Sequence, residues 1–291
     1  MYTLIDGNKI ASEIKSEIAR EVARMVSSGI KIPHLAAILV GRNPSSETYV
    51  NNKVKDCEEV GFKSTLLRLS EEITENDLLA KIRELNEDDD VDAFIVQLPL
   101  PGHISESSVT EAIDPSKDAD GFHPVNLGRM VAGLPGYLPA TPFGVIELLD
   151  RYGINVSGRN CVILGRSNIV GRPLSILLSQ KGRDATVTLV HSRTRNIPEL
   201  VRKADIVIAA LGSPGFVKAD MISDGAVVID VGTTRVESPL SKKGWRLAGD
   251  VDFDNVAPKC SYISPVPGGV GPMTRVALLK NTLLAAMRRV R

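Results

Sequence analysis

The chain has 291 residues, of which 43% are hydrophobic and 24% are charged, and its formal net charge is zero. This length allows two domains, and the composition is ordinary for a soluble globular protein. A balanced charge gives no support for a nucleic-acid partner, and no segment approaches the roughly 20 apolar residues of a membrane helix.

The three cysteines and four histidines indicate in which compartment the protein acts and whether it binds a structural metal. The cysteines are odd in number and widely spaced, which favours reduced thiols over a disulfide framework. The first residues lack the basic and apolar regions of a signal peptide. We therefore expect a cytoplasmic protein. The histidines form no metal-ligand spacing, so no metal site is expected.

Segments with helix and strand patterns alternate through the first half of the chain. Helical spacing of apolar residues predicts helices at Ile10–Met25, Ser46–Val60 and Thr74–Asn86. Buried strands are expected at His34–Gly41, Ser64–Leu69 and Val91–Leu98. The acidic run 87–90 is predicted to be a solvated loop. This alternation predicts an α/β fold with a parallel sheet covered by helices.

A domain boundary is expected near Pro139 and Pro142, which interrupt the pattern before a helix that runs to Tyr152. A rigid loop is expected at 264–272 and a closing helix from about Arg275 to Arg289. The predicted domains are 1–140, with 275–291 packing back on it, and 141–274. The strands of the second domain are predicted at Cys161–Leu164, Thr186–Val190, Ile206–Ala210 and Ala226–Val231.

The turn Gly165–Pro173 joins an apolar strand to a helix predicted at Leu174–Leu178. Glycines let a backbone approach a ligand closely, and a helix N-terminus offers unpaired N–H groups and a positive dipole end. The spacing differs from GxGxxG, so the segment is a variant phosphate turn. We expect it to bind a dinucleotide.

The segment after the strand Thr186–Val190 indicates whether the site binds NAD or NADP. A site for NAD usually has an acid there, for the ribose hydroxyls. Here Ser192, Arg193 and Arg195 follow the strand, and Arg166 stands in the phosphate turn. Guanidinium groups bind phosphate in a bidentate manner, so NADP with its 2′-phosphate is favoured. The alternative is a basic solvated loop.

Glycine turns follow two further predicted strands, at Gly212 and at Gly232. Ligands of open α/β sheets lie beyond the carboxyl ends of the strands, so these glycines would let the backbone approach the cofactor. Ordinary turn chemistry is the alternative.

Polar residues of the first domain suggest a second ligand. Tyr49 and Lys53 are four positions apart and share one face of the predicted helix. A partly desolvated lysine has a lowered pKa and can act as an acid or base near neutrality. Gln97 ends an apolar strand before two prolines, and an Asp of the turn 115–122 could bind the N–H groups of a heterocycle. The alternatives are a surface helix, a loop cap and an Asx-turn.

Together these segments resemble the bifunctional methylenetetrahydrofolate dehydrogenase/methenyltetrahydrofolate cyclohydrolase family over nearly the whole chain. The resemblance rests on Ser46–Lys55, Val96–Pro101, Lys117–Phe122, Thr141–Gly144, the turn at Gly165 and Pro265–Thr274.

The resemblance implies two α/β lobes around a deep cleft, with folate in the first lobe and NADP in a Rossmann-like second lobe. It implies a homodimer joined through the cofactor domains. It also implies NADP-dependent oxidation of 5,10-methylenetetrahydrofolate to the methenyl form, followed by hydrolysis to 10-formyltetrahydrofolate. A dehydrogenase that has lost the cyclohydrolase, or a non-catalytic dinucleotide-binding protein, remains an alternative.

The resemblance also implies roles for single residues. Lys53 would be the key acid/base, assisted by Gln97, while Tyr49 would stack beside the folate and Asp120 would hold the pterin. The expected cofactor contacts are Gly165, Arg166, Ser167, Ser192 and, at the nicotinamide half, Thr233.

Two positions depart from the family pattern. Ala140 stands where many members have Cys, so no thiol chemistry is expected there. Arg275 stands where an apolar residue is common.

Overall fold

The structure is a computed structural model that describes residues 1–239, 241 and 244–289. The chain forms two compact units, one of Met1–Ala11 with Thr141–Thr274 and one of Ser12–Ala140 with Arg275–Arg291. Both are α/β, which confirms the predicted fold class. The first eleven residues were expected in the other unit. They join the unit that contains Thr141–Thr274 because β1 (Thr3–Leu4) pairs in parallel with β11 (Cys260–Ile263).

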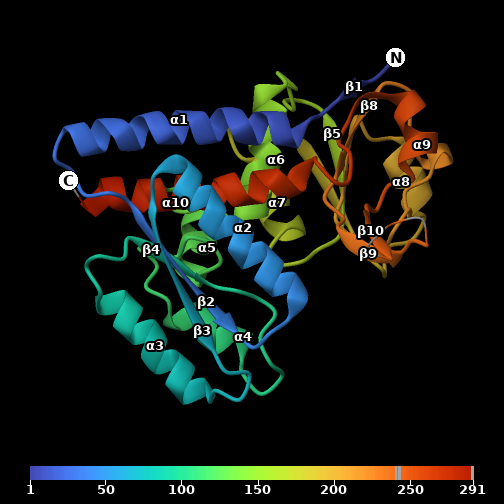
Figure 1. The fold of residues 1–291 in the computed structure, drawn as a ribbon. Coiled ribbons are helices and arrows are strands. Elements are labelled where there is room, and N and C mark those ends of the chain that lie inside the picture. The colour runs from blue at the N-terminus through green and yellow to red at the C-terminus, as the bar shows by residue number, and fades with distance from the viewer. Residues whose placement is uncertain (240, 242–243, 290–291) are drawn as a thin grey trace. The chain divides into compact units, whose positions relative to one another are not determined.

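The unit Ser12–Ala140 is built on a parallel three-stranded sheet (Figure 1). Its order is β3-β2-β4, with β2 at His34–Val40, β3 at Lys63–Leu69 and β4 at Ala93–Val96. All seven residues of β2 are buried, as expected for the central strand of a covered parallel sheet. The helices that lie wholly within this unit are α2 (Pro44–Val60), α3 (Glu75–Glu87), α4 (Glu106–Ala112) and α5 (Pro124–Val131).

Alternate positions of β2 explain how the helices cover this sheet. Ala36, Ile38 and Val40 point to one face, where they share an apolar cluster with residues of α3, α4 and β4. Helix α2 packs on β2 and β3 without entering that cluster. It ends at Val60 because Gly61 adopts a φ of +80°, a conformation that favours glycine.

The unit that contains Thr141–Thr274 is built on a parallel sheet in the order β1-β11-β8-β7-β5-β6. Four of its strands are β5 (Asn160–Leu164), β6 (Thr186–Val190), β7 (Ile206–Ala209) and β8 (Ala226–Asp230). Each lies within one residue of its prediction at either end. A separate antiparallel hairpin is formed by β9 (Thr234–Glu237) and β10 (Trp245–Ala248).

The remaining helices are α1 (Gly7–Ser27), α6 (Ala140–Arg151), α7 (Gly171–Ser179), α8 (Ile197–Arg202), α9 (Phe253–Val256) and α10 (Val270–Arg289), and two short 3₁₀ turns lie at Ala219–Met221 and Ala257–Lys259. Two predicted boundaries were wrong. Helix α7 begins three residues earlier than predicted, and α10 begins inside the expected loop 264–272. In both places a Gly or Pro stands in the first turn of the helix, where the missing intrahelical N–H bonds make these residues acceptable.

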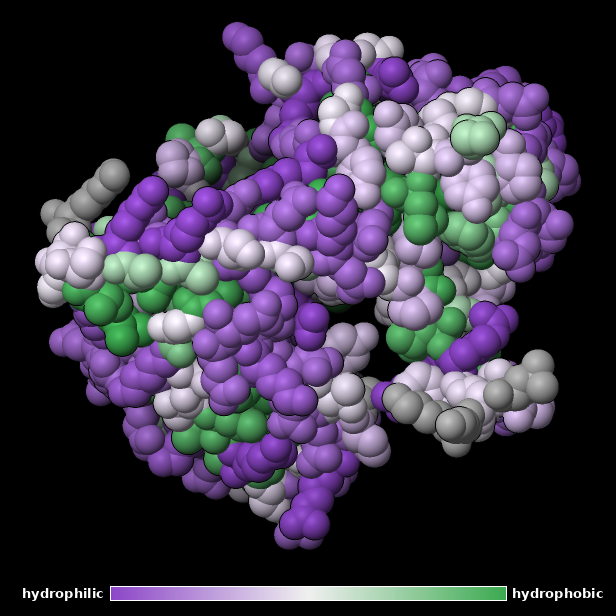
Figure 2. Space-filling model, turned by 45° about the horizontal axis from the view of Figure 1, so that its top comes forward, coloured by the Kyte–Doolittle hydropathy of each residue, from purple (hydrophilic) through white to green (hydrophobic). Residues whose placement is uncertain are grey.

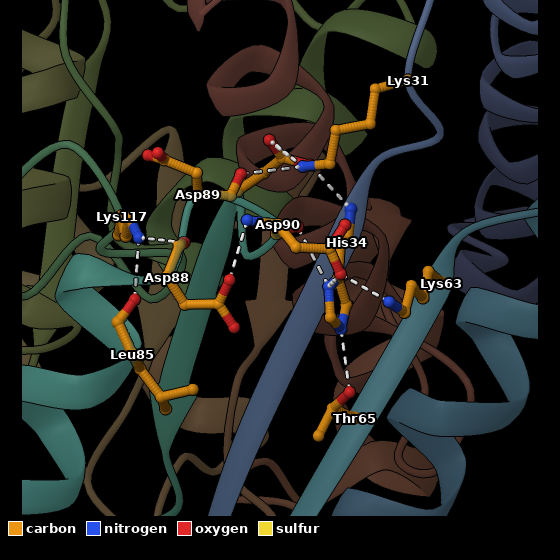
Figure 3. A network of polar contacts seen from close by, with 10 residues as sticks. Lys31, His34, Lys63, Thr65, Leu85, Asp88, Asp89, Asp90 and Lys117 are labelled. Carbon is orange, nitrogen blue, oxygen red and sulfur yellow. Dashed lines mark hydrogen bonds and ion pairs between the residues drawn. The ribbon is translucent and has the colours of Figure 1, made fainter.

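The acidic run 87–90, predicted to be a solvated loop, makes specific polar contacts (Figure 3). The Asp90 carboxylate contacts His34 Nδ1 at 3.0 Å and also pairs with Lys63, while His34 Nε2 lies 2.9 Å from Thr65 Oγ1. Lys117 Nζ donates at 2.7 Å to the backbone oxygens of Leu85 and Asp88. The run therefore ties the end of α3 to the amino ends of β2 and β3.

The face drawn in Figure 2 is mostly hydrophilic, with hydrophobic residues gathered in several separate areas. Among the described residues, no helix has the length and hydropathy needed to cross a membrane. The same part of the chain holds no group of three or more His, Cys, Asp and Glu side chains arranged to bind a metal.

Candidate functional site

The structure brings Lys53 and Gln97 together. Lys53 lies on α2 and Gln97 follows β4 directly, so a helix and a strand end position the pair. Lys53 Nζ donates to Gln97 Oε1 at 3.0 Å, and Gln97 Nε2 donates to the carbonyl of Leu98 at 2.7 Å. The second bond fixes the amide so that its oxygen faces the amine. The lysine is thereby oriented by an uncharged partner.

Burial sets the proton affinities of this group. Desolvation lowers the pKa of Lys53, and the charge of Asp120 opposes that shift. Desolvation raises the pKa of Asp120 to about 6, opposed by the charge of Lys53 and reinforced by Asp118. Burial therefore shifts the pKa of each group away from its value in water, as is common for residues of functional sites.

The turn that carries Asp120 is built on its neighbour Asp118. The buried Asp118 carboxylate accepts hydrogen bonds from the N–H of Gly121 at 3.0 Å, from the N–H of His123 at 2.8 Å and from Asn126 Nδ2 at 2.9 Å. The Asx-turn considered from the sequence is thus the role of Asp118. Asp120 interacts instead with Lys53 through charge.

Ala140, the departure from the family pattern, also touches this turn. It is buried, begins α6 and donates its N–H to the carbonyl of Asp120 at 3.2 Å. The contact uses only the backbone, so a side chain without a thiol can serve there.

Tyr49 lies one turn before Lys53 on α2, and 46% of its surface is exposed. A ring held by a helix and open on one side suits stacking against a flat heterocycle. The structure therefore places Tyr49 and Lys53 on the same helix, as the spacing predicted.

The phosphate turn in the second unit is crowded by backbone. A Cβ on Gly165, whose φ is +115°, would lie 2.1 Å from the oxygen of Ala210, and one on Gly171 would lie 2.0 Å from the oxygen of Gly165. Helix α7 starts without a side-chain cap, while Ser167 Oγ accepts the N–H of Val170 at 3.1 Å. The uncapped N-terminus and its close-packed glycines fit a bound phosphate.

The basic loop after β6 lies at the same sheet edge, because β5 and β6 are parallel neighbours with Leu164 opposite Val190. His191 Nδ1 accepts the N–H of Arg193 at 3.1 Å, and Thr194 Oγ1 accepts the N–H of His191 at 3.0 Å. These bonds shape the loop and leave its basic and hydroxyl groups exposed. Exposed basic and hydroxyl side chains at this edge include Arg166, Ser167, Ser192, Arg193 and Arg195. This donor set fits a dinucleotide with a 2′-phosphate.

Two buried acids, Asp230 and Asp250, were missed by the sequence analysis. The Gly232 backbone was expected to approach the cofactor. A Cβ there would lie 2.5 Å from the Cγ of Asp250, so the missing side chain also makes room for a carboxylate. Asp230 ends the apolar strand β8 in the way that Gln97 follows β4. The polar residue at the end of this buried strand could have identified Asp230 from the sequence.

Fold and site together define a two-domain α/β enzyme with a dinucleotide-binding unit. The model of the catalytic domain of tetrahydrofolate dehydrogenase/cyclohydrolase matches residues 5–120, and that of its NAD(P)-binding domain matches residues 139–290. The chain belongs to the tetrahydrofolate dehydrogenase/cyclohydrolase family, which confirms the predicted resemblance.

Individual relatives match the chain over its whole length. The bifunctional protein FolD of Bacteroides fragilis is 62% identical over 290 residues, which are 99% of either chain. The crystal structure of the bifunctional FolD enzyme of Campylobacter jejuni has a TM-score of 0.94 at 46% identity, with 99% of this chain and 100% of that chain covered. A Trypanosoma brucei FolD structure, complexed with NADP cofactor and an inhibitor, has a TM-score of 0.95 at 41% identity, with 100% and 99% covered.

Proposed function

We propose that the enzyme oxidises 5,10-methylenetetrahydrofolate with NADP⁺ and then hydrolyses the methenyl product to 10-formyltetrahydrofolate. The observation that carries the proposal is the Lys53–Gln97 pair, with the charge of Asp120 acting on Lys53, in the domain that matches the family's catalytic model. A protein that only binds a dinucleotide has no use for a lysine held in this way.

The dehydrogenase step needs little acid–base help. The bridge carbon of the substrate lies between two nitrogens, whose lone pairs stabilise the cation that remains when hydride leaves. Bound NADP⁺ supplies the hydride acceptor. We assign its phosphates and ribose to Gly165, Arg166, Ser167 and Ser192, and its nicotinamide half to the region of the exposed Thr233.

The cyclohydrolase step requires proton transfers. Water adds to the bridge carbon and loses both of its protons as its oxygen becomes the formyl oxygen. The carbon–N5 bond breaks and N5 takes up one proton, so that the sum releases one proton. We assign the transfers to Lys53 Nζ, whose lowered pKa makes its neutral form accessible. Gln97 orients the amine through its 3.0 Å bond.

Two further residues hold the substrate in this proposal. Tyr49 stacks on the pterin with its exposed ring, and the Asp120 carboxylate accepts hydrogen bonds from N–H groups of the pterin. Asp120 then has two effects, since its charge also favours the protonated form of Lys53.

The enzyme is further proposed to act in the cytoplasm, as a homodimer joined through its cofactor units. The buried, unpaired cysteines Cys57, Cys161 and Cys260 fit a reducing compartment. Sedimentation velocity of the purified chain at several concentrations tests the dimer. A single species of monomer mass throughout would reject it.

The direct test of the reaction mixes the purified chain with 5,10-methylenetetrahydrofolate and either NADP⁺ or NAD⁺, and records spectra over time. The proposal predicts NADPH formation with little methenyl cation beyond a no-enzyme control. Reduced dinucleotide with a persistent methenyl signal would indicate a monofunctional dehydrogenase. A preference for NAD⁺ would reject the role of the basic loop.

A further inference from the structure

The turns that follow β7 and β8 are held by carboxylates from elsewhere in the same unit. The fully buried Asp250 accepts three successive backbone N–H groups of the turn after β7. Its Oδ2 lies 2.5 Å from the N of Leu211 and 3.0 Å from that of Gly212, and its Oδ1 lies 2.7 Å from the N of Ser213. Successive N–H groups that converge in this way form an anion-binding nest, and here the protein's own carboxylate fills it.

Asp230 connects this turn to the next one. Its Oδ1 accepts the N–H of Gly232, in the turn after β8, and the N–H of Asp250, both at 2.9 Å. Its Oδ2 accepts the N–H of Val251 at 2.9 Å. The backbone of Asp230 is fixed in turn, since its N–H donates to Ser264 Oγ at 2.7 Å. A continuous set of hydrogen bonds therefore runs from one turn to the other.

Glycines make room for both carboxylates. A Cβ on Gly249 would lie 2.0 Å from Asp230 Oδ2, and a Cβ on Gly232 would lie 2.5 Å from the Cγ of Asp250. Any shift of Asp250 would therefore be passed to backbone at the carboxyl end of the sheet, where a dinucleotide binds.

We propose that Asp250 is a positioning residue of the cofactor site, which together with Asp230 sets the shape of the turns 211–213 and 232–233 for the nicotinamide half of NADP. The proposal rests on the proposed function, because it takes these turns as the nicotinamide side. Asp250 acts through backbone amides and is itself buried away from the ligand.

An amide at position 250 cannot replace the carboxylate. Asn has one acceptor oxygen, and its NH₂ group would meet a backbone N–H, donor against donor. At least one N–H of the nest would then lose its acceptor, so the turn should rearrange. The adenosine side of the site lies at β5 and β6 and does not use this nest.

The test compares two ligands on the full chain by calorimetry: NADP⁺, and adenosine 2′,5′-bisphosphate, which has the phosphorylated adenosine half without nicotinamide. Asp250→Asn should weaken NADP⁺ binding about tenfold or more while adenosine 2′,5′-bisphosphate stays within about twofold. The matched control is Asp252→Asn, the same change of charge two residues away, where the carboxylate pairs with Lys218 at 3.2 Å. It should change neither affinity.

Gly249→Ala provides a second variant, since its φ is not positive and its added methyl group would displace the Asp230 carboxylate. Gly249→Ala should also weaken NADP⁺ binding while leaving adenosine 2′,5′-bisphosphate binding unchanged. It should further speed hydrogen exchange at the amides of 211–213. Both effects can be measured in this variant even if Asp250→Asn folds poorly. An equal loss for both ligands in both variants, or no loss in either, would overturn the proposal. Failure of the unsubstituted chain to bind either ligand would instead reject the cofactor site itself.

Discussion

A single lysine carries most of the chemistry proposed here, and its environment explains why. Lys53 loses hydration, which favours its neutral form, while Asp120 favours the charged form. Gln97 orients the amine without adding charge. Lys53 thus combines a fixed position with a pKa that burial lowers, so that its proton is removed more readily than that of a lysine in water.

Asp120→Asn should lower the pKa of Lys53 further, because the substitution removes the negative charge that opposes desolvation. The titration can be followed by NMR of side-chain-labelled lysine in the absence of substrate, with Lys53→Met used to assign the signal. Glu58→Gln, a change of charge further along the same helix, is the control and should leave the signal in place. A pKa that stays constant or rises in Asp120→Asn would contradict the electrostatic account.

For single residues, the sequence predicted the helix face or strand end that carries them better than the residues that they contact. Spacing placed Tyr49 and Lys53 on one helical face, and the end of an apolar strand singled out Gln97. No local pattern could show that Gln97 Oε1 meets Lys53 Nζ, which are 44 positions apart in sequence. Asp250 was missed for a related reason, since its role depends on backbone amides 37 to 39 positions earlier in the sequence.

At the scale of elements, α10 and α2 are joined by a buried charge. Arg275 Nε lies 3.2 Å from Asp56 Oδ2, and Lys15 Nζ lies 3.4 Å from Oδ1 of the same carboxylate. Asp56 stands one turn after Lys53 on α2. The departure from the family pattern at position 275 therefore supports the helix that carries the proposed acid/base.

Arg275→Leu, which places an apolar residue there, should destabilise the protein by about 1–3 kcal/mol, because the buried Asp56 carboxylate loses one cation and keeps the 3.4 Å contact with Lys15. The loss should be smaller when Asp56→Asn is already present. Urea unfolding of the two single variants and the double variant measures this coupling. Strictly additive losses would show that the pair contributes nothing.

The start of α7 should not tolerate a side chain at Gly171. Gly171→Ala places a methyl group against the oxygen of Gly165, so the phosphate turn has to open and binding of adenosine 2′,5′-bisphosphate should fall at least about tenfold. Gly128→Ala is the control, because nothing lies within 4 Å of its added Cβ and alanine favours a helix. Equal affinities in both variants would reject the role of the turn.

Most strands of the two parallel sheets were predicted closely, whereas β1 and β11 were missed. The strand β6 was predicted at its observed bounds, and α2 began two residues before its prediction. The strands β1 and β11 were missed because each is short. β1 has two residues and pairs with β11, about 260 positions away, and β11 has four residues and lies between β1 and β8. Such strands leave no periodic signal in the sequence.

The whole molecule should carry a pH dependence of stability from both units. Burial raises the pKa of Asp120 and of Asp230 to about 6. The folded state then holds these protons up to a higher pH than the unfolded state does, so the free energy of unfolding should fall as pH rises from about 4 to about 6.

Thermal unfolding across this range, in buffers of equal ionic strength, measures the effect. Asp120→Asn should reduce the slope, since one of the two groups no longer titrates. A stability that rises between these pH values in the unsubstituted chain, with no change of slope in the variant, would contradict the assignment of buried carboxyls.

The family assignment came from six motifs spread over the chain, and the comparisons confirm it at the scale of the whole molecule. The division into units was harder to predict. The cuts after 140 and 274 lie where the prolines and the closing helix suggested them, but the first eleven residues belong to the other unit through a strand too short to recognise.

The central claim is that one protein performs both reactions and that Lys53 is needed for the second. Its most direct test follows NADPH and the methenyl cation together, with 5,10-methylenetetrahydrofolate and NADP⁺, in the unsubstituted enzyme, in Lys53→Met and in the exposed control Lys55→Met. We predict that Lys53→Met still forms NADPH but accumulates the methenyl cation, while Lys55→Met behaves as the unsubstituted enzyme. Equal loss of both activities in Lys53→Met, or loss of neither, would contradict the account.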